Sequence, residues 1–365
     1  MSVEATGYRP ARSVGTPVPA DPYRVAMKLG YALGYWGRRP PTNIPELLAE
    51  AVDLGYESVW TAEAYGSDAL MPLAWWGSRF PTLRLGTAIA QLSARTPTAT
   101  AMAALTLDHL SEGRFVLGLG VSGPQVVEGW YGDEYAKPLA RTREYVDIIR
   151  AVLAREAPVV HDGERYRLPR PGGTGLGKPL RSIVEPLRAD LPILLAAEGP
   201  KNVALAAEIG DGWLTFLYSA HHHDLYAPSL AEGMARRAPD RANRPFEIVA
   251  SVPVVVDDDV AAAADRVRPM LALYIGGMGA KSANFHHEVA VRMGYDAEAK
   301  EVQRLYLGGA KQEAEAALPL SLIEKLALVG PPAKIADDLA TWRESPVDTF
   351  VVQGDPAALR AIAGA

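Results

Sequence analysis

The chain has 365 residues, 48% of them hydrophobic and 22% charged, a balance typical of a globular protein with a sizeable core. Its formal net charge of −6 offers no basic field to nucleic acid or anionic lipid, and no apolar run approaches the roughly 18 to 20 residues of a membrane span. The lack of cysteine excludes disulfides, thiolate metal ligands and cysteine nucleophiles. We expect a cytoplasmic enzyme or binding protein with no nucleic-acid or membrane partner.

Residues 1–26 contain four prolines and no apolar segment of the kind that marks a secretory signal. We expect an extended arm there, outside one domain that spans residues 27–365. Within that domain, short apolar strands alternate with helix-length segments. The expected strands are 27–34, 57–63, 83–90, 114–120, 192–198, 211–218, 246–256 and 349–354.

Helix-length segments separate these strands, among them 44–55 (with Asn43 as its cap), 97–111, 139–154 and 201–210. Repeated βα units imply parallel strands joined by right-handed crossovers. Eight such units favour an α/β fold of the closed (β/α)8 TIM barrel type, with an open doubly wound sheet as the alternative. The long intervals after strands 4 and 7 predict insertions there, and the second interval reads as one long helical stretch to about residue 328.

Two glycine-rich segments resemble nucleotide motifs. Residues 118–123, GLGVSG, fit the dinucleotide fingerprint G-x-G-x-x-G, but they follow the fourth strand instead of the first. No continuous helix follows, so an NAD site is disfavoured. Residues 172–179, GGTGLGKP, fit G-x-x-x-x-G-K, but Pro179 stands where a phosphate loop needs a hydroxyl for Mg²⁺. We expect a mobile loop there, after a hairpin that turns at Asp162-Gly163.

The ends of the strands carry more useful signals, because chemistry in such barrels sits at the C-terminal ends of the strands. Strand 5 ends in AAEGPKN (196–202), where Gly199-Pro200 begins a helix beside Lys201. Free backbone N–H groups and the helix dipole would attract an anion there, although an ordinary loop explains the pattern equally well. Other strand ends carry aromatic side chains that could wall a flat ligand: Tyr31, Tyr35, Trp36, Tyr65 and Tyr218.

Five segments together carry a family resemblance. They are ESVWTAEAYGSDAL (57–70), LGTAIAQLSARTP (85–97), GRFVLGLGVSGPQVVEGWYG (113–132), GGTGLGKPL (172–180) and AAEGPKNVALAAEIGDGWL (196–214). The chain resembles the luciferase-like monooxygenase superfamily, in its branch that uses the deazaflavin coenzyme F420, from about Met27 to Val352. The resemblance implies a homodimeric (β/α)8 barrel that transfers a hydride between the deazaflavin C5 and a small organic substrate.

The resemblance also implies a cofactor site. It places Thr87, Ala88 and Ile89 behind the ring system, with a non-proline cis peptide near Ala88-Ile89. The strand-4 loop would lie near the ring edge, and the strand-5 loop would face the phosphate of the tail. These two loops contribute Gly120, Val121, Ser122 and Gln125, and Ala197, Glu198, Gly199, Pro200 and Lys201. Glu198 would repel a phosphate, so a hydroxyl contact or a structural role suits it better; Gln125 or Glu128 could also contact the substrate.

The end of strand 2 departs from the sugar-phosphate dehydrogenases of this superfamily, which carry Asp-His where this chain has Ala62-Glu63. The substrate of those enzymes therefore cannot be carried over. Glu63 is the candidate catalytic residue: it would handle a proton or hydrogen-bond to the ring, and the alternative is a carboxylate that pairs with a nearby cation.

Three further features have simpler interpretations. His221, His222 and His223 fit a solvated surface better than a metal site, and so do His286 and His287 unless their segment forms part of a lid. We expect no metal. Trp75 and Trp76 suit a dimer interface. Two other functions stay open: an FMN-dependent monooxygenase on the same barrel, and a non-catalytic flavin-binding protein.

Overall fold

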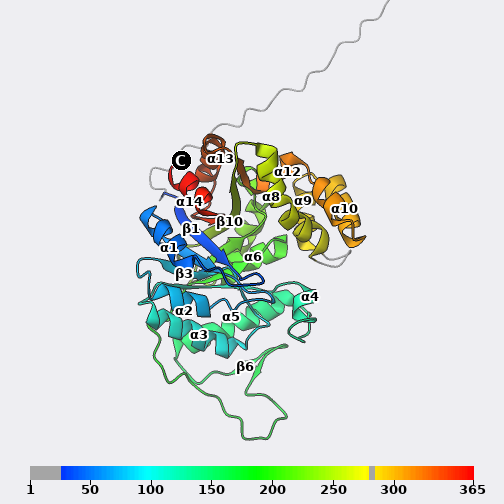
Figure 1. Ribbon diagram of the computed structural model, residues 1–365. Helices are drawn as coiled ribbons and strands as arrows, with labels where there is room; N and C mark the ends of the chain where they lie inside the picture. Colours follow the sequence, from blue (N-terminus) through cyan, green and yellow to red (C-terminus); the bar gives the residue numbers. More distant parts are fainter. Residues whose placement is uncertain (1–25, 279–283) are drawn as a thin grey trace, which may run out of the picture.

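Eight parallel strands close into a barrel in the computed structural model, which describes residues 26–278 and 284–365 (Figure 1). Each strand pairs with its neighbours in the order β1, β2, β3, β5, β8, β9, β10 and β12, and β12 pairs with β1 to close the ring. Their bounds are β1 Lys28–Gly34, β2 Ser58–Thr61, β3 Arg84–Thr87, β5 Phe115–Gly120, β8 Ile193–Ala196, β9 Gly212–Thr215, β10 Glu247–Val256 and β12 Thr349–Gln353. The predicted TIM barrel is confirmed, and its eight strands are the eight expected from the sequence.

Helices surround the barrel because each presents an apolar stripe to the outer face of the strands. They are α1 Ile44–Asp53, α2 Met71–Gly77, α3 Pro97–Leu110, α5 Pro138–Ala154, α6 Pro200–Ile209, α7 Ala227–Ala235, α8 Val260–Ala272, α13 Pro332–Glu344 and α14 Pro356–Ala363. Asn43 precedes α1 as expected, but its side chain makes no capping hydrogen bond.

The two predicted insertions interrupt the βα alternation. After β5, the fourth barrel strand, come α4 Pro124–Val127 and a hairpin of β6 His161–Asp162 and β7 Arg167–Leu168. The hairpin turns through residues 163–166, two residues longer than the expected turn at Asp162-Gly163. A long irregular segment then leads back to β8.

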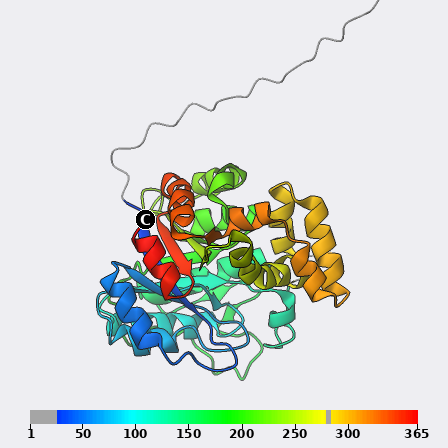
Figure 2. The same cartoon turned by 45° about the horizontal axis from the view of Figure 1, so that its top comes forward.

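After β10, the seventh barrel strand, the expected long helix is broken into shorter elements. They are α8, the π-helical turn η2 Leu273–Gly277, α9 Phe285–Arg292, α10 Asp296–Leu307, α11 Lys311–Ala316, α12 Leu320–Leu326 and β11 Leu328–Gly330. Figures 1 and 2 show α9, α10 and α12 gathered on one side of the barrel. Their own apolar core is separate from the one that packs the helices onto the barrel. The insertion therefore behaves as a packed unit at the barrel rim.

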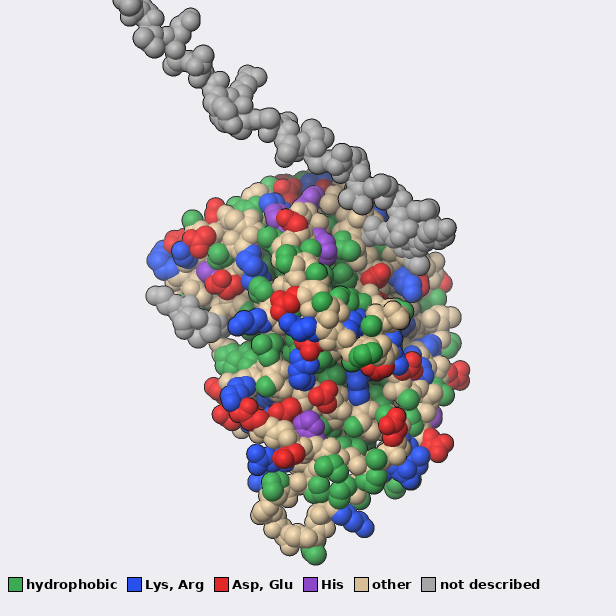
Figure 3. All heavy atoms as spheres, turned by 180° about the vertical axis from the view of Figure 1, so that it is seen from behind, with side chains coloured by type: hydrophobic (Ala, Val, Ile, Leu, Met, Phe, Trp, Pro, Cys, Tyr) green, Lys and Arg blue, Asp and Glu red, His purple; other side chains and the backbone are tan. Residues whose placement is uncertain are grey.

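No helix among the described residues has the length and apolar composition to cross a membrane. Basic and acidic side chains are interspersed over the face that Figure 3 shows. Residues 1–25 of the predicted arm lie outside the described part of the chain, and the division into an arm and one domain stays a prediction.

Candidate active site

The C-terminal end of β3 is distorted where the ring system was expected to lie. The hydroxyl of Thr87 accepts a hydrogen bond from the Gly118 amide and donates one to the Gly118 carbonyl, each at 2.8 Å. The next peptide bond, Ala88-Ile89, is cis, as expected. Pairing with β5 then resumes in β4 Ala90–Gln91. A Cβ on Gly118 would overlap the Thr87 carbonyl, so only glycine permits this close approach.

A small apolar floor lies at this end of the barrel. Side chains from six strands fill the interior: Trp60, Val116, Leu194, Leu214, Val249 and Val351. Four partly buried residues pack onto this cluster: Ala32, Ala88, Ile89 and Ala196. Ala32 and Ala196 lie near the C-terminal ends of their strands, and Ala88 follows the end of β3. Short side chains there leave a low, apolar surface of the kind that a flat ring needs.

One polar pair lies beside this floor. Ser251 and Gln353 follow Val249 and Val351 by two residues, so the alternation of side chains along a strand places them on the same inner face. The side-chain amide of Gln353 donates a hydrogen bond to the Ser251 hydroxyl at 2.7 Å. Sequence inspection missed both residues, because each lies within a strand that otherwise reads as apolar.

The loop after β5 provides a second side of the site. Ser122 adopts a left-handed conformation with φ of 60°, which turns the chain sharply after Val121. Both residues are half-buried, whereas Gln125 is exposed on α4. Gly120 packs against Ile89, so this loop adjoins the distorted end of β3.

The loop after β8 places positive charge at the start of α6. Gly199 precedes that helix, and Pro200 is its first residue. Lys201 is exposed, and a Cβ on Gly199 would meet no atom within 4 Å. Arg292, which the sequence did not single out, reaches over from α9 and donates to the Glu198 carbonyl at 2.8 Å. Lys201, Arg292 and the free backbone N–H groups of the first turn thus place positive charge at the start of α6.

Glu63 lies at the expected strand end, but its carboxylate is not free. One oxygen accepts from the backbone amide of Gln91 and from Arg95 Nη1, both at 2.8 Å. The other accepts from the backbone amide of Ala69 and from Arg95 Nη2, both at 3.2 Å. These four contacts use the roughly four lone-pair sites of a carboxylate. The side chain is 4% exposed. The geometry favours the alternative interpretation, in which Glu63 pairs with a cation.

Arg95, which the sequence did not single out, joins three segments of the site. It also contacts Asp68, whose second oxygen accepts from the amides of Leu70 and Met71. Burial alone would lower the pKa of Arg95, but hydrogen bonding to Glu63 and the charges of Glu63 and Asp68 outweigh it and raise that pKa. The network ties the end of β2 to β4 and to the start of α2.

Only part of the expected aromatic wall is present. Tyr35 and Tyr65 are exposed at the ends of β1 and β2, and Trp36 is half-buried. Tyr31 and Tyr218 were wrongly assigned to the wall: Tyr31 is buried and contacts the Gly354 carbonyl, and Tyr218 packs among outer aromatic side chains. Tyr31 neighbours the inward-facing Ala32 on β1, so alternation points it away from the barrel interior, and Tyr218 packs against the outer apolar core.

The insertion after β10 supplies the missing part of the wall. Tyr274 lies against Phe216, with ring centroids 4.7 Å apart, and against His286 at 4.9 Å. Burial raises the pKa of Tyr274, and repulsion from the negative charges that Tyr35 and Glu198 carry when ionised raises it further. The surface interpretation of His286 and His287 is wrong: each is 8% exposed, and His286 is hydrogen-bonded to Glu198.

The other histidine cluster has ordinary partners. His222 contacts Ser219 at 3.2 Å, and His223 contacts the Tyr218 hydroxyl at 3.0 Å. His221 is exposed, whereas His222 and His223 are half-buried. In the described part of the chain, no group of three or more histidine, aspartate or glutamate side chains is arranged to hold a metal ion.

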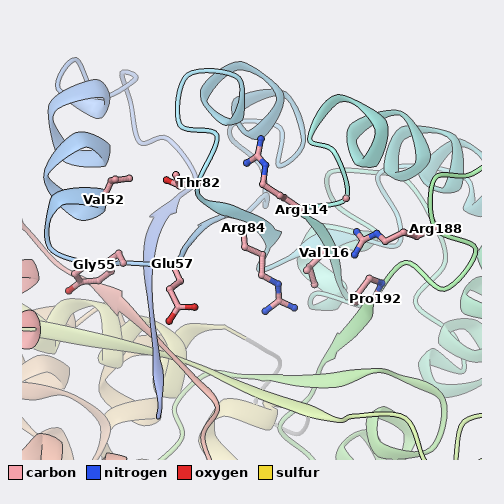
Figure 4. A pocket seen from close by; sticks show the side chains of 11 residues that line it. Val52, Gly55, Glu57, Thr82, Arg84, Arg114, Val116, Arg188 and Pro192 are labelled. Carbon is pink, nitrogen blue, oxygen red and sulfur yellow. The ribbon is translucent and has the colours of Figure 1, made fainter. Parts of the chain in front are cut away.

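A cavity of about 590 Å³ opens at the opposite, N-terminal end of the barrel (Figure 4). Its three arginines already have partners. Arg84 makes two hydrogen bonds of 2.7 Å to Glu247, Arg188 pairs with Asp108, and Arg114 donates to the carbonyls of Leu83 and Gly77. These cations stabilise the barrel, and this cavity is far from the strand ends that carry the candidate site.

Comparisons with known proteins agree with this geometry. Residues 20–349 match the luciferase-like monooxygenase family. The chain is 56% identical over 333 residues to a Mycobacterium tuberculosis protein provisionally named a coenzyme F420-dependent oxidoreductase, covering 91% of this chain and 96% of that protein. It is 31% identical over 229 residues to a 5,10-methylenetetrahydromethanopterin reductase of Archaeoglobus fulgidus, covering 62% of this chain and 64% of that protein.

A solved structure shares the fold. The coenzyme F420-dependent tetrahydromethanopterin reductase of Methanopyrus kandleri superimposes with a TM-score of 0.74 at 21% identity, over 93% of this chain and 98% of that one. The family match spans most of the sequence, and the high identity to the mycobacterial protein extends over nearly the full length of both chains. The protein is therefore an enzyme of the luciferase-like monooxygenase family, and within that family it groups with oxidoreductases named for coenzyme F420.

Proposed function

We propose that this enzyme binds coenzyme F420 at the C-terminal mouth of the barrel and transfers a hydride between the deazaflavin C5 and a small organic substrate. The observation that carries the proposal is the combination of an apolar floor with positive charge at the start of α6 on the same rim. A deazaflavin coenzyme has the matching parts, a flat ring system and an anionic phosphate tail. The name of the mycobacterial relative supports the same assignment.

Different residues of the rim would bind the ring and the tail of the coenzyme. Ala88, Ile89 and the loop of Gly120, Val121 and Ser122 would hold the ring on its apolar face and at its edge. The tail would lie along Ala197 to Lys201, with its phosphate at the start of α6. Lys201 and Arg292 would neutralise that charge, which lowers the cost of removing it from water. Gln125 is exposed next to the ring edge and would contact either the cofactor or the substrate.

We propose a positioning role for Glu63. It acts through Arg95 and Gln91, and it fixes the distorted end of β3 on which the ring would rest. When bound, the coenzyme supplies the carbon that accepts or donates the hydride. The protein's own part is to orient the substrate carbon against that position and to exclude water from it.

The direct test of the cofactor is a titration of the purified protein with coenzyme F420 and, separately, with FMN, each followed by its own fluorescence. Saturable binding of coenzyme F420 with weak or absent FMN binding supports the proposal. Preferential binding of FMN would favour a flavin monooxygenase instead. A panel of alcohols, aldehydes and enones, followed by the absorbance of the bound coenzyme, then identifies a substrate. Tight binding without turnover of any panel member would indicate a flavin-binding protein.

We also propose a homodimer built on α2 and α3. Trp75 and Met102, one on each helix, are 57% and 62% exposed in the single chain. Other large apolar side chains are exposed close by, because the segment with Ile183 and Leu187 is fastened to α3 through Arg188 and Asp108. Exposed apolar surface of this extent on neighbouring elements suits contact with a second copy. A location in the cytoplasm stays a prediction from the sequence.

A further inference from the structure

A histidine and a carboxylate form a buried pair at the mouth of the barrel. Glu198 lies two residues beyond Ala196, the last residue of β8, in the loop that leads into α6. His286 comes from α9, 88 residues away in sequence. Its Nδ1 lies 2.9 Å from one oxygen of Glu198 and 2.7 Å from the other, and both side chains are 8% exposed.

The imidazole of His286 lies among aromatic side chains at the mouth of the barrel. Its ring meets Tyr274 edge-on at 4.9 Å and Phe216 at 6.4 Å. Phe216 directly follows β9 at this end of the barrel and packs against the apolar core of the insertion. His286 therefore lies on the insertion side of the barrel mouth, at the rim where the cofactor ring would bind.

The two nitrogens of this imidazole are in different situations. Nδ1 is held by Glu198, whereas Nε2 makes no hydrogen bond to any described residue. A carboxylate that holds one ring nitrogen fixes the tautomer and orientation, and it leaves the other nitrogen to give or take a proton. Glu63 is not suited to that task, because its oxygens are occupied.

We propose that His286 is the acid–base residue of the reaction and that Glu198 is its positioning residue, a proposal that rests on the proposed function. In the oxidation direction, the substrate C–H bond breaks and its electron pair leaves with the hydrogen to the deazaflavin C5. The substrate O–H bond gives its proton to His286 Nε2, and a C=O bond forms. The substrate loses two electrons and the cofactor gains them.

In reduction the same proton returns from His286 to the substrate oxygen. The substrate class is therefore a hydroxyl or carbonyl compound that reacts at the carbon bearing the oxygen.

A structural role must be separated from a chemical one, because the pair also fastens α9 to the barrel. His286→Asn keeps a side-chain N–H that can donate to Glu198, but it cannot exchange a proton near neutral pH. His287→Asn is the matched control, since His287 is equally buried on the same helix and lacks the contact with Glu198. Thermal unfolding of both variants shows whether each is folded at the assay temperature.

The first measurement needs no turnover. Nuclear magnetic resonance of protein labelled with ¹⁵N-histidine, with His286 assigned by loss of its signals in His286→Asn, follows the ring while coenzyme F420 is added. The His286 signals should shift on binding and the His287 signals should move less. Fluorescence records binding separately. Failure of coenzyme F420 to bind at all would refute the proposed function itself. Binding without a shift at His286 would overturn only the present proposal.

The second measurement uses the substrate identified by the panel. His286→Asn should lower turnover about 10²- to 10⁴-fold, the usual contribution of general acid–base catalysis, while the Kd for coenzyme F420 changes less than about threefold. Added imidazole should restore part of the turnover of His286→Ala, which a merely structural role would not allow. Glu198→Gln should lower turnover less than His286→Asn and should not be rescued by imidazole. Normal turnover in His286→Asn, or equal losses in His286→Asn and His287→Asn, would overturn the proposal.

Discussion

Arg95 holds both oxygens of Glu63, with Nη1 at 2.8 Å from one and Nη2 at 3.2 Å from the other. This fork lies between the ends of two neighbouring strands, and the second carboxylate that Arg95 contacts, Asp68, begins the segment that leads into α2. Bidentate pairs of this kind fix geometry as well as charge. The rim that would hold the ring is thus braced before any ligand binds.

Replacement of Glu63 tests whether it braces the rim or exchanges a proton. Glu63→Gln keeps the shape but replaces one acceptor oxygen with an N–H₂ donor that faces Arg95 and the backbone amide of either Gln91 or Ala69. We expect a loss of about 1–3 kcal/mol in the free energy of unfolding, the cost of buried groups left without partners, and weaker binding of coenzyme F420. Turnover at saturating cofactor should stay nearly normal. A loss of turnover near 10²-fold or more with normal cofactor affinity would instead restore Glu63 as an acid–base residue.

The positive charge at the start of α6 predicts that binding of coenzyme F420 depends on salt. Lys201→Ala should weaken binding of coenzyme F420 roughly tenfold at low ionic strength, because a charge-assisted contact contributes on the order of 1.5–3 kcal/mol. The difference from wild type should shrink as salt is raised, since screening weakens the contact that the variant lacks. Lys300→Ala is the control, because Lys300 is an exposed lysine on α10 that pairs with Asp296. Unchanged affinity of Lys201→Ala at low salt would place the tail elsewhere.

Two glycines at the rim should respond differently to the same added methyl group. Gly118→Ala drives its Cβ into the Thr87 carbonyl and should cost about 1–3 kcal/mol of stability, with a larger loss if the backbone cannot shift. Gly199→Ala meets open space and should fold normally, but its methyl group would project into the proposed path of the cofactor tail. Urea unfolding and fluorescence titration separate the two effects. Equal stability of the two variants would contradict the close approach of β3 and β5.

The polar layer at the N-terminal end of the barrel predicts a dependence of stability on pH. Burial alone would raise the pKa of Glu247, but the hydrogen bonds and charge of Arg84, with Thr349 and Lys28, hold it below its ordinary value of 4.5. A carboxylate with a depressed pKa stabilises the fold above the unfolded value, and that contribution is lost as pH falls through the lower folded value.

Thermal unfolding of Glu247→Gln and wild type between pH 7 and pH 3 checks this expectation. The variant should be less stable than wild type at pH 7, and this difference in stability should become smaller below about pH 4.5. Glu57→Gln, at an exposed carboxylate that lines the cavity at the same end, is the control and should follow wild type. A constant gap across the pH range would show that the charge of Glu247 does not contribute.

The proposed dimer predicts that two surface substitutions change the oligomeric state. Trp75→Ser with Met102→Glu removes apolar surface from α2 and places a charge on α3, so it should shift the protein towards a monomer at micromolar concentration. Light scattering coupled to size-exclusion chromatography measures the mass. Trp130→Ser removes an exposed tryptophan from beyond α4 and should leave the mass unchanged. A wild-type monomer, or a double variant with wild-type mass, would rule out this interface.

The sequence by itself determined the order of the eight strands, because each buried strand is a short apolar run bounded by glycine or by a helix signal. That order implies the barrel, and parallel strands necessarily bring their C-terminal ends together. Thr87, Gly120, Gly199 and Lys201 could therefore be assigned to one rim without knowledge of any contact. The close approach of Thr87 to Gly118 also has a local sequence signal, since glycine replaces the larger residues that a buried strand otherwise carries.

Only the tertiary structure decided which charged side chains are free and which are paired. Glu63 and Arg95 are 32 residues apart, and Glu198 and His286 are 88 apart. No periodicity of the sequence links such residues, since an ion pair depends on where two loops end in space. The same holds for Arg292 and Tyr274, which come from an insertion whose packing onto the rim depends on its own apolar core. Strand order follows from local patterns of burial, whereas the pairing of charged and titratable side chains at the rim follows from contacts between distant segments.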